Sequence, residues 1–164
     1  MNNPTCDEWY QLGMEMGHIS SNWRKIYHEM VSLFGHSNKF PKLLDNIISK
    51  KLMQLKSDLD DQINGAFPLA ITQLPGYDVN LVGVFYSLNN GICYSSPKNY
   101  KKYPKKISLA QHDEIHLHID RTVAYLNKVD DILPSKLILK QFLNILNKVK
   151  YTLDHNIDFF DDET

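Results

Sequence analysis

The chain has 164 residues, with 18 basic and 19 acidic side chains and a formal net charge of −1 at pH 7. Hydrophobic residues make up 43% and charged residues 23% of the sequence, which excludes wholesale disorder. The balanced charge excludes binding of nucleic acid through the overall charge, so an electrostatic function must depend on local clusters. We expect residues 1–164 to form a single domain.

Two helices are predicted in the first 65 residues. Thr5 and Glu8 have the spacing of a capping box, in which each side chain bonds a free backbone amide at the helix start. Apolar residues then recur at steps of three and four until Gly35 ends the helix. A second helix is predicted over residues 41–64, and the short connection predicts an antiparallel helical hairpin.

An antiparallel β unit is predicted next, where the apolar period changes from about 3.6 to 2. Residues 79–88 are rich in β-branched and aromatic side chains, and Asn90-Gly91 is typical of a two-residue hairpin turn. Residues 92–95 form the return strand, and residues 70–74 can add a third strand. The register places apolar side chains on both faces, so either helices cover both faces or one face docks a partner.

Two more helices are predicted in the C-terminal part. Ser108 and Gln111 form a second capping box at the start of a helix that runs to about Ile132. Pro134 separates this helix from a last one that ends near His155. The order predicts a predominantly helical α+β fold: two N-terminal helices, a central two- or three-stranded antiparallel β meander and two C-terminal helices.

Neither a signal peptide nor a membrane span is predicted from the sequence. The N-terminus lacks the basic and apolar regions of a signal peptide, and no apolar run approaches the roughly 20 residues of a membrane span. We therefore expect a cytoplasmic protein without a membrane partner. Cys6 and Cys93 are expected to be free thiols. The apolar helix faces can close within a monomer or across a homodimer.

A group of histidines in the third predicted helix is the candidate metal site. His112, His116 and Asp120 follow one another at intervals of four, so a helix places them on one arc of its surface. Two imidazoles one turn apart are good ligands for zinc or another first-row metal. A site needs a third and usually a fourth ligand, and no second matching motif exists. The alternative is that the histidines face solvent or bond to neighbouring side chains.

A run of lysines and tyrosines before that helix is the candidate nucleic-acid site. Positive charge attracts phosphate, and tyrosine rings offer stacking platforms for unpaired bases. The alternative is a solvated linker that keeps a sheet edge from pairing. The residues of the nucleic-acid candidate are Lys98, Tyr100, Lys101, Lys102, Tyr103, Lys105 and Lys106.

The hairpin and the acidic C-terminal tail are the candidate surfaces for a protein partner. The tail has five acidic residues and no lysine or arginine after residue 150, and it contains two adjacent phenylalanines. Such a segment can dock on a basic partner or fold back onto residues 98–106 of the same chain, and the alternative is a frayed acidic terminus. The partner-binding candidates are Tyr86, Tyr94, Phe159, Phe160, Asp161 and Asp162.

The sequence contains no nucleophile motif, no phosphate-binding glycine loop and no dinucleotide fingerprint. We therefore expect no cofactor and a non-enzymatic protein-binding module that acts as an inhibitor, immunity or adaptor protein of bacterial or phage type. The alternatives are a nucleic-acid-binding regulator that uses residues 98–106 and a metal-binding helical protein centred on His112 and His116.

Overall fold

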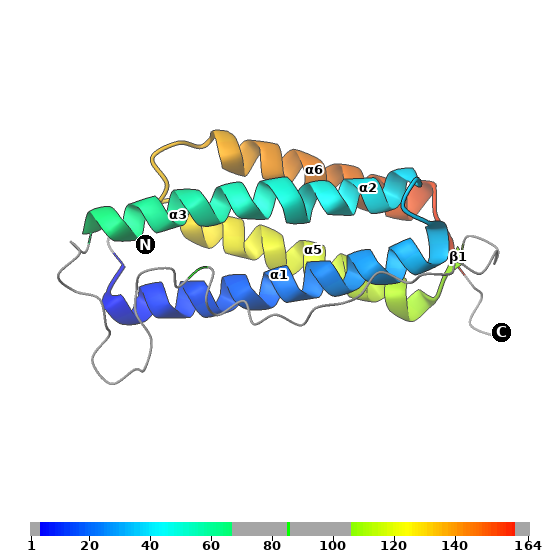
Figure 1. Cartoon of the computed structure of the whole chain (residues 1–164), viewed down its shortest axis with the longest axis horizontal. Coiled ribbons are helices and arrows are strands. Elements are labelled where there is room, and N and C mark those ends of the chain that lie inside the picture. Colours follow the sequence, from blue (N-terminus) through cyan, green and yellow to red (C-terminus); the bar gives the residue numbers. More distant parts are fainter. Residues whose placement is uncertain (1–3, 67–84, 86–105, 160–164) are drawn as a thin grey trace.

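Four helical segments lie side by side in the computed structural model, which describes residues 4–66, 85 and 106–159 (Figure 1). Three of the segments are single helices, and one is a continuous rod of two α-helices joined by a π-helical turn. The bounds are α1 (Cys6–Phe34), the rod of α2 (Lys39–Asn46), η1 (Ile47–Lys51) and α3 (Leu52–Ala66), α5 (Leu109–Val129) and α6 (Leu137–His155).

α1 begins and ends at the predicted residues. Thr5 Oγ1 accepts a hydrogen bond from the Glu8 amide at 3.2 Å, and Glu8 Oε1 accepts one from the Thr5 amide at 3.0 Å. Gly35 has a φ of 83°, and its amide donates to the Val31 carbonyl at 2.8 Å. Glycine adopts this left-handed conformation without the steric penalty of a side chain, so the helix stops here.

The π-helical turn η1 keeps the buried residues of α2 and α3 on the same side of the rod. Buried residues follow α-helical steps of three and four along most of the rod, but Ile47 and Leu52 are five apart. A π-turn adds one residue to a helical turn, so it keeps both side chains on the core side. Both are 2% exposed or less. The rod therefore packs on its neighbours along its whole length.

Each of the four helical segments has two neighbours in the bundle. α1 packs against α2 and α5, and α6 packs against the same two segments. Figure 1 shows that every neighbouring pair is antiparallel, so α3 ends and α5 begins at opposite ends of the bundle. β1 (Lys106–Ile107) and β2 (Asp158–Phe159) form a parallel pair before α5 and after α6.

The predicted α+β fold class is wrong. The described residues form a helical bundle, and their only strands are the two-residue strands β1 and β2, which are parallel. Residues 70–74 and 79–95, on which the meander was predicted, lie outside the described residues except for Phe85. Phe85 is helical and fully buried, with its ring centroid 6.0 Å from that of Trp9. A short apolar run does not distinguish a strand from a buried helical turn, because both only require covered apolar side chains.

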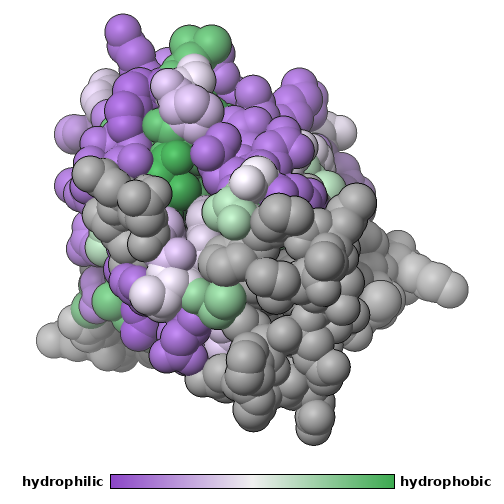
Figure 2. Space-filling view, turned by 90° about the vertical axis from the view of Figure 1, so that its left-hand side faces the viewer, coloured by the Kyte–Doolittle hydropathy of each residue, from purple (hydrophilic) through white to green (hydrophobic). Residues whose placement is uncertain are grey.

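The surface of the described residues is mainly polar. Figure 2 shows the end of the bundle that lies at the left in Figure 1, where hydrophilic residues predominate and apolar ones form small areas. No helix in the described ranges combines the length and the apolar composition needed to cross a membrane. Cys6 is a free thiol, and Cys93 lies outside the described residues.

Buried polar groups connect α1 to α5. Trp23 is fully buried, and its Nε1 donates a hydrogen bond to Thr122 Oγ1 at 2.9 Å. The Thr122 hydroxyl in turn donates to the His118 carbonyl at 2.7 Å. Tyr125, also buried, donates from its hydroxyl to the Leu12 carbonyl at 2.9 Å. A buried donor without a partner is costly, so these bonds select one register between the two helices.

We expect Thr122→Val to destabilise the protein by about 1–3 kcal/mol, because it leaves Trp23 Nε1 buried without an acceptor. Valine has nearly the shape of threonine, so the change removes the hydrogen bonds and little else. The measurement is the free energy of unfolding in urea. Thr152→Val on α6 is the matched control, since the Thr152 hydroxyl has no hydrogen-bond partner among the described residues. Equal stability of the two variants would contradict this role of Thr122.

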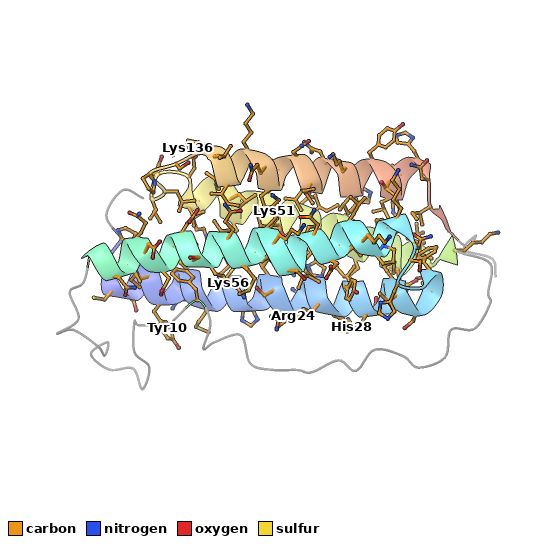
Figure 3. The ribbon with its side chains drawn as sticks, turned by 45° about the horizontal axis from the view of Figure 1, so that its top comes forward. Tyr10, Arg24, His28, Lys51, Lys56 and Lys136 are labelled. Carbon is orange, nitrogen blue, oxygen red and sulfur yellow. The ribbon has the colours of Figure 1, made fainter. Side chains whose placement is uncertain are left out.

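Lys56 of α3 is the charged side chain that lies deepest in the bundle. It is 1% exposed, and Figure 3 shows it on the side of α3 that faces α1, where Arg24 lies. Burial, together with the positive charge of Arg24, lowers the pKa of Lys56 from 10.5 to about 8. Between these two values the unfolded chain binds a proton that the folded protein does not, so stability rises with pH.

We expect the free energy of unfolding of the wild type to rise relative to that of Lys56→Met as the pH increases from 8 towards 10. A tenfold change in proton affinity is about 1.4 kcal/mol, so the full effect is roughly 3 kcal/mol. The measurement is urea unfolding at several pH values. Lys51→Met is the control, because Lys51 is only half-buried on η1. A constant difference between wild type and Lys56→Met would show that Lys56 keeps its ordinary proton affinity.

Candidate metal centre

The start of α5 and the end of α6 meet at one end of the bundle. Ser108 caps α5: its Oγ accepts from the Gln111 amide at 3.1 Å, and Gln111 Oε1 accepts from the Ser108 amide at 2.9 Å. Directly before this cap, Lys106 of β1 pairs with Asp158 of β2, which follows α6. The cap and the strand pair therefore hold the first turn of α5 beside the last turn of α6.

His112, His116 and Asp154 come together at this junction. The His116 Nε2 atom lies 2.7 Å from Asp154 Oδ1, and the His112 Nε2 atom lies 3.4 Å from the same oxygen. The two imidazole rings have centroids 4.6 Å apart. One ligand atom from each of the three residues lies within 4.8 Å of the others, and no second His, Cys, Asp or Glu group of this kind exists in the described ranges.

One of these distances already suits a transition metal ion, and small shifts of the side chains would bring the others into range. Bonds of about 2.0–2.2 Å from nitrogen and oxygen to a tetrahedral zinc ion place the ligand atoms roughly 3.3–3.6 Å apart. The separation of His112 Nε2 from Asp154 Oδ1 already has this value, at 3.4 Å. The shorter contact of His116 is a hydrogen bond, so a metal would replace its proton and move the two atoms slightly apart.

A second carboxylate orients one of the two imidazoles. His112 Nδ1 lies 3.3 Å from Asp113 Oδ1, on the opposite side of the ring from Asp154. If Nδ1 carries the proton that Asp113 accepts, then Nε2 has its lone pair directed towards Asp154 and His116. Metal-binding histidines commonly have such an acceptor on the nitrogen that does not bind the metal. In that tautomer, His112 is oriented as a ligand before any metal is present.

The two histidines also determine the charge state of Asp154. Burial alone raises its pKa, but the hydrogen bond and positive charge of His116, and then those of His112, outweigh burial and lower the pKa. Asp154 as a carboxylate therefore stabilises the fold, and this contribution is lost as the pH falls from the ordinary pKa of 3.8 through the lowered one. The side chains of His112, His116 and Asp154 are 18%, 26% and 35% exposed, so a small ion can reach them.

Two of the three residues predicted as metal ligands lie together in the structure, and the third lies apart from them. His112 and His116 lie together, but Asp120 is exposed and is not part of the cluster. Asp154 takes its place, although its sequence position belongs to the acidic C-terminal region. Asp154 could have been found from the sequence, because an antiparallel arrangement of the last two predicted helices puts the end of one beside the start of the other.

The other candidate surfaces lie almost entirely outside the described residues. Of the nucleic-acid candidate, only Lys106 is described, in β1. Of the partner-binding candidates, only Phe159 is described, in β2. Nucleic-acid binding by residues 98–106 and an inhibitor, immunity or adaptor function therefore stay predictions. The candidates outside the described ranges are Lys98, Tyr100, Lys101, Lys102, Tyr103, Lys105, Tyr86, Tyr94, Phe160, Asp161 and Asp162.

No family model matches this chain, and neither a curated protein nor a solved structure is significantly similar to it. A functional assignment therefore depends on the geometry of the chain itself.

Proposed function

We propose that this protein binds a divalent first-row transition metal ion, with zinc as the best match, through His112, His116 and Asp154. The observation that carries the proposal is the convergence of three ligand atoms from two helices within 4.8 Å. His116 and Asp154 are separated by 38 positions in the sequence, so local helix geometry does not bring them together. The packing of α5 against α6 does.

The donor set supports zinc, copper, nickel or iron over calcium or magnesium. Two imidazole nitrogens and one carboxylate oxygen are typical ligands of first-row transition metals, whereas calcium and magnesium require mainly oxygen ligands. Three protein ligands leave a fourth position of a tetrahedral ion for water or another small molecule. A zinc ion in this position would polarise that molecule as a Lewis acid. It would also cross-link the ends of α5 and α6.

We expect wild-type protein without a histidine tag to bind one zinc ion, as measured by isothermal titration calorimetry with zinc chloride after treatment with a chelator. Asp154→Asn and His116→Ala should each weaken binding at least about tenfold, because each removes a ligand. A zinc concentration one hundred times the dissociation constant should stabilise the wild type by about 2.7 kcal/mol, because only the folded state presents the site. Thermal unfolding with and without zinc measures this gain.

Two matched variants test whether zinc binds at this cluster and not at a neighbouring side chain. Asp120→Asn changes the carboxylate that the sequence predicted as a ligand, and His155→Ala removes a histidine beside Asp154 that is not part of the cluster. Both should bind zinc as the wild type does. Absence of stoichiometric zinc, nickel or copper binding to the wild type would rule out the proposal. Equal losses in the control variants would place the metal elsewhere.

A further inference from the structure

A groove lies between α2 and α6, near the same end of the bundle as the candidate metal centre. Lys39 and Leu43 line it from α2, and Asn147, Lys148 and Tyr151 line it from α6. It has a volume of about 540 Å³. Neither His112, His116 nor Asp154 lines it, so it is a separate site. We call it the α2–α6 groove.

A second hollow of about 390 Å³ continues the α2–α6 groove towards the start of α2. Both hollows are lined by Lys39, Thr152 and Asn156. The second is also lined by Phe34 and Phe40, whose rings pack edge to face with centroids 6.3 Å apart. Sites for small molecules commonly have volumes of about 300–1,000 Å³, so each hollow has the size of a ligand site.

The α2–α6 groove offers an apolar wall. Leu43 is half-buried in it, and Tyr151 is 61% exposed, a large exposure for an aromatic residue in this bundle. The Tyr151 ring lies against the His155 ring, with centroids 4.4 Å apart. This contact holds one face of the tyrosine, so the ring can serve as a flat platform for an apolar ligand.

The polar groups of the α2–α6 groove are positive or neutral. Lys39 and Lys148 are exposed, and within the described residues neither has an ion-pair partner and no carboxylate lines the groove. The side chains of Asn147, Thr152 and Asn156 likewise have no hydrogen-bond partner within the described part of the chain. Among the described residues, the groove therefore combines two positive charges without an ion-pair partner, hydrogen-bonding groups without a partner and an apolar wall.

We propose that the α2–α6 groove binds a small amphipathic organic anion: a carboxylate, sulfonate or phosphate ester attached to an apolar body. The apolar body would lie against Leu43 and Tyr151, and the anionic group would lie between Lys39 and Lys148. Two ammonium groups with no acidic neighbour among the described residues favour an anion, and the apolar wall favours a ligand with an apolar body over free phosphate. The proposal does not depend on the metal centre.

The probe for this proposal is 8-anilinonaphthalene-1-sulfonate, which joins apolar rings to a sulfonate and fluoresces when it leaves water. We expect one molecule to bind per chain at neutral pH. The double variant Lys39→Gln/Lys148→Gln should weaken binding at least about tenfold, because both positive charges are lost. The neutral analogue N-phenyl-1-naphthylamine should bind more weakly than the sulfonate, and its affinity should not change in the double variant.

The matched control is Lys50→Gln/Lys140→Gln, which removes two exposed lysines outside the groove and should leave the affinity for the sulfonate unchanged. Tyr151→Ser should weaken binding of both probes, which tests the apolar wall. Decanoate should displace the sulfonate, and inorganic phosphate should not. Circular dichroism and cooperative unfolding confirm that each variant is folded.

Three results would overturn the proposal. The first is equal loss of affinity in the two double lysine variants, which would mean general attraction to surface lysines. The second is displacement by inorganic phosphate, which would mean an anion site without an apolar part. The third is an affinity that falls as the protein concentration rises, which would identify a second copy of this chain as the occupant of the groove.

Discussion

The antiparallel packing of α5 against α6 is the constraint on which the candidate metal centre depends. Buried apolar residues run along both helices, among them Ile115 and Ile119 on α5 and Val149 and Leu153 on α6. Burial of one such side chain is worth about 1.5–3 kcal/mol, whereas one surface ion pair is worth about 0–1 kcal/mol. The helices pack to bury these residues, and His112, His116 and Asp154 meet as a consequence.

The last two turns of α6 serve two separate surfaces. Asp154 points towards α5 and the two histidines, whereas Lys148 and Tyr151 line the groove against α2. Successive side chains of a helix are about 100° apart, so one helix can direct different side chains to different neighbours around a buried stripe. Leu153 and Val149 form that stripe, and the polar residues flank it on either side.

The four helical segments, both ends of α1 and the start of α5 could be predicted from the sequence because the signals are local. Thr5 with Glu8 and Ser108 with Gln111 form capping boxes as their spacing indicated, and Gly35 ends the first helix. Local signals did not suffice for the central region, where the predicted β meander was wrong. Its apolar run includes Phe85, which is helical and packs on Trp9, a residue 76 positions earlier. Whether such a run becomes strand or helix depends on what covers it.

By itself, the sequence determined that four helical segments form, where α1 begins and ends, where α5 begins, which side chains face the core, and that two histidines share one helical face. These properties depend on residues within one or two helical turns of each other. Only the tertiary structure decided that Asp154 rather than Asp120 lies beside the histidines, and that Lys39 and Lys148 face one groove. Both outcomes join residues from different helices, and their distances depend on helix packing that no local pattern specifies.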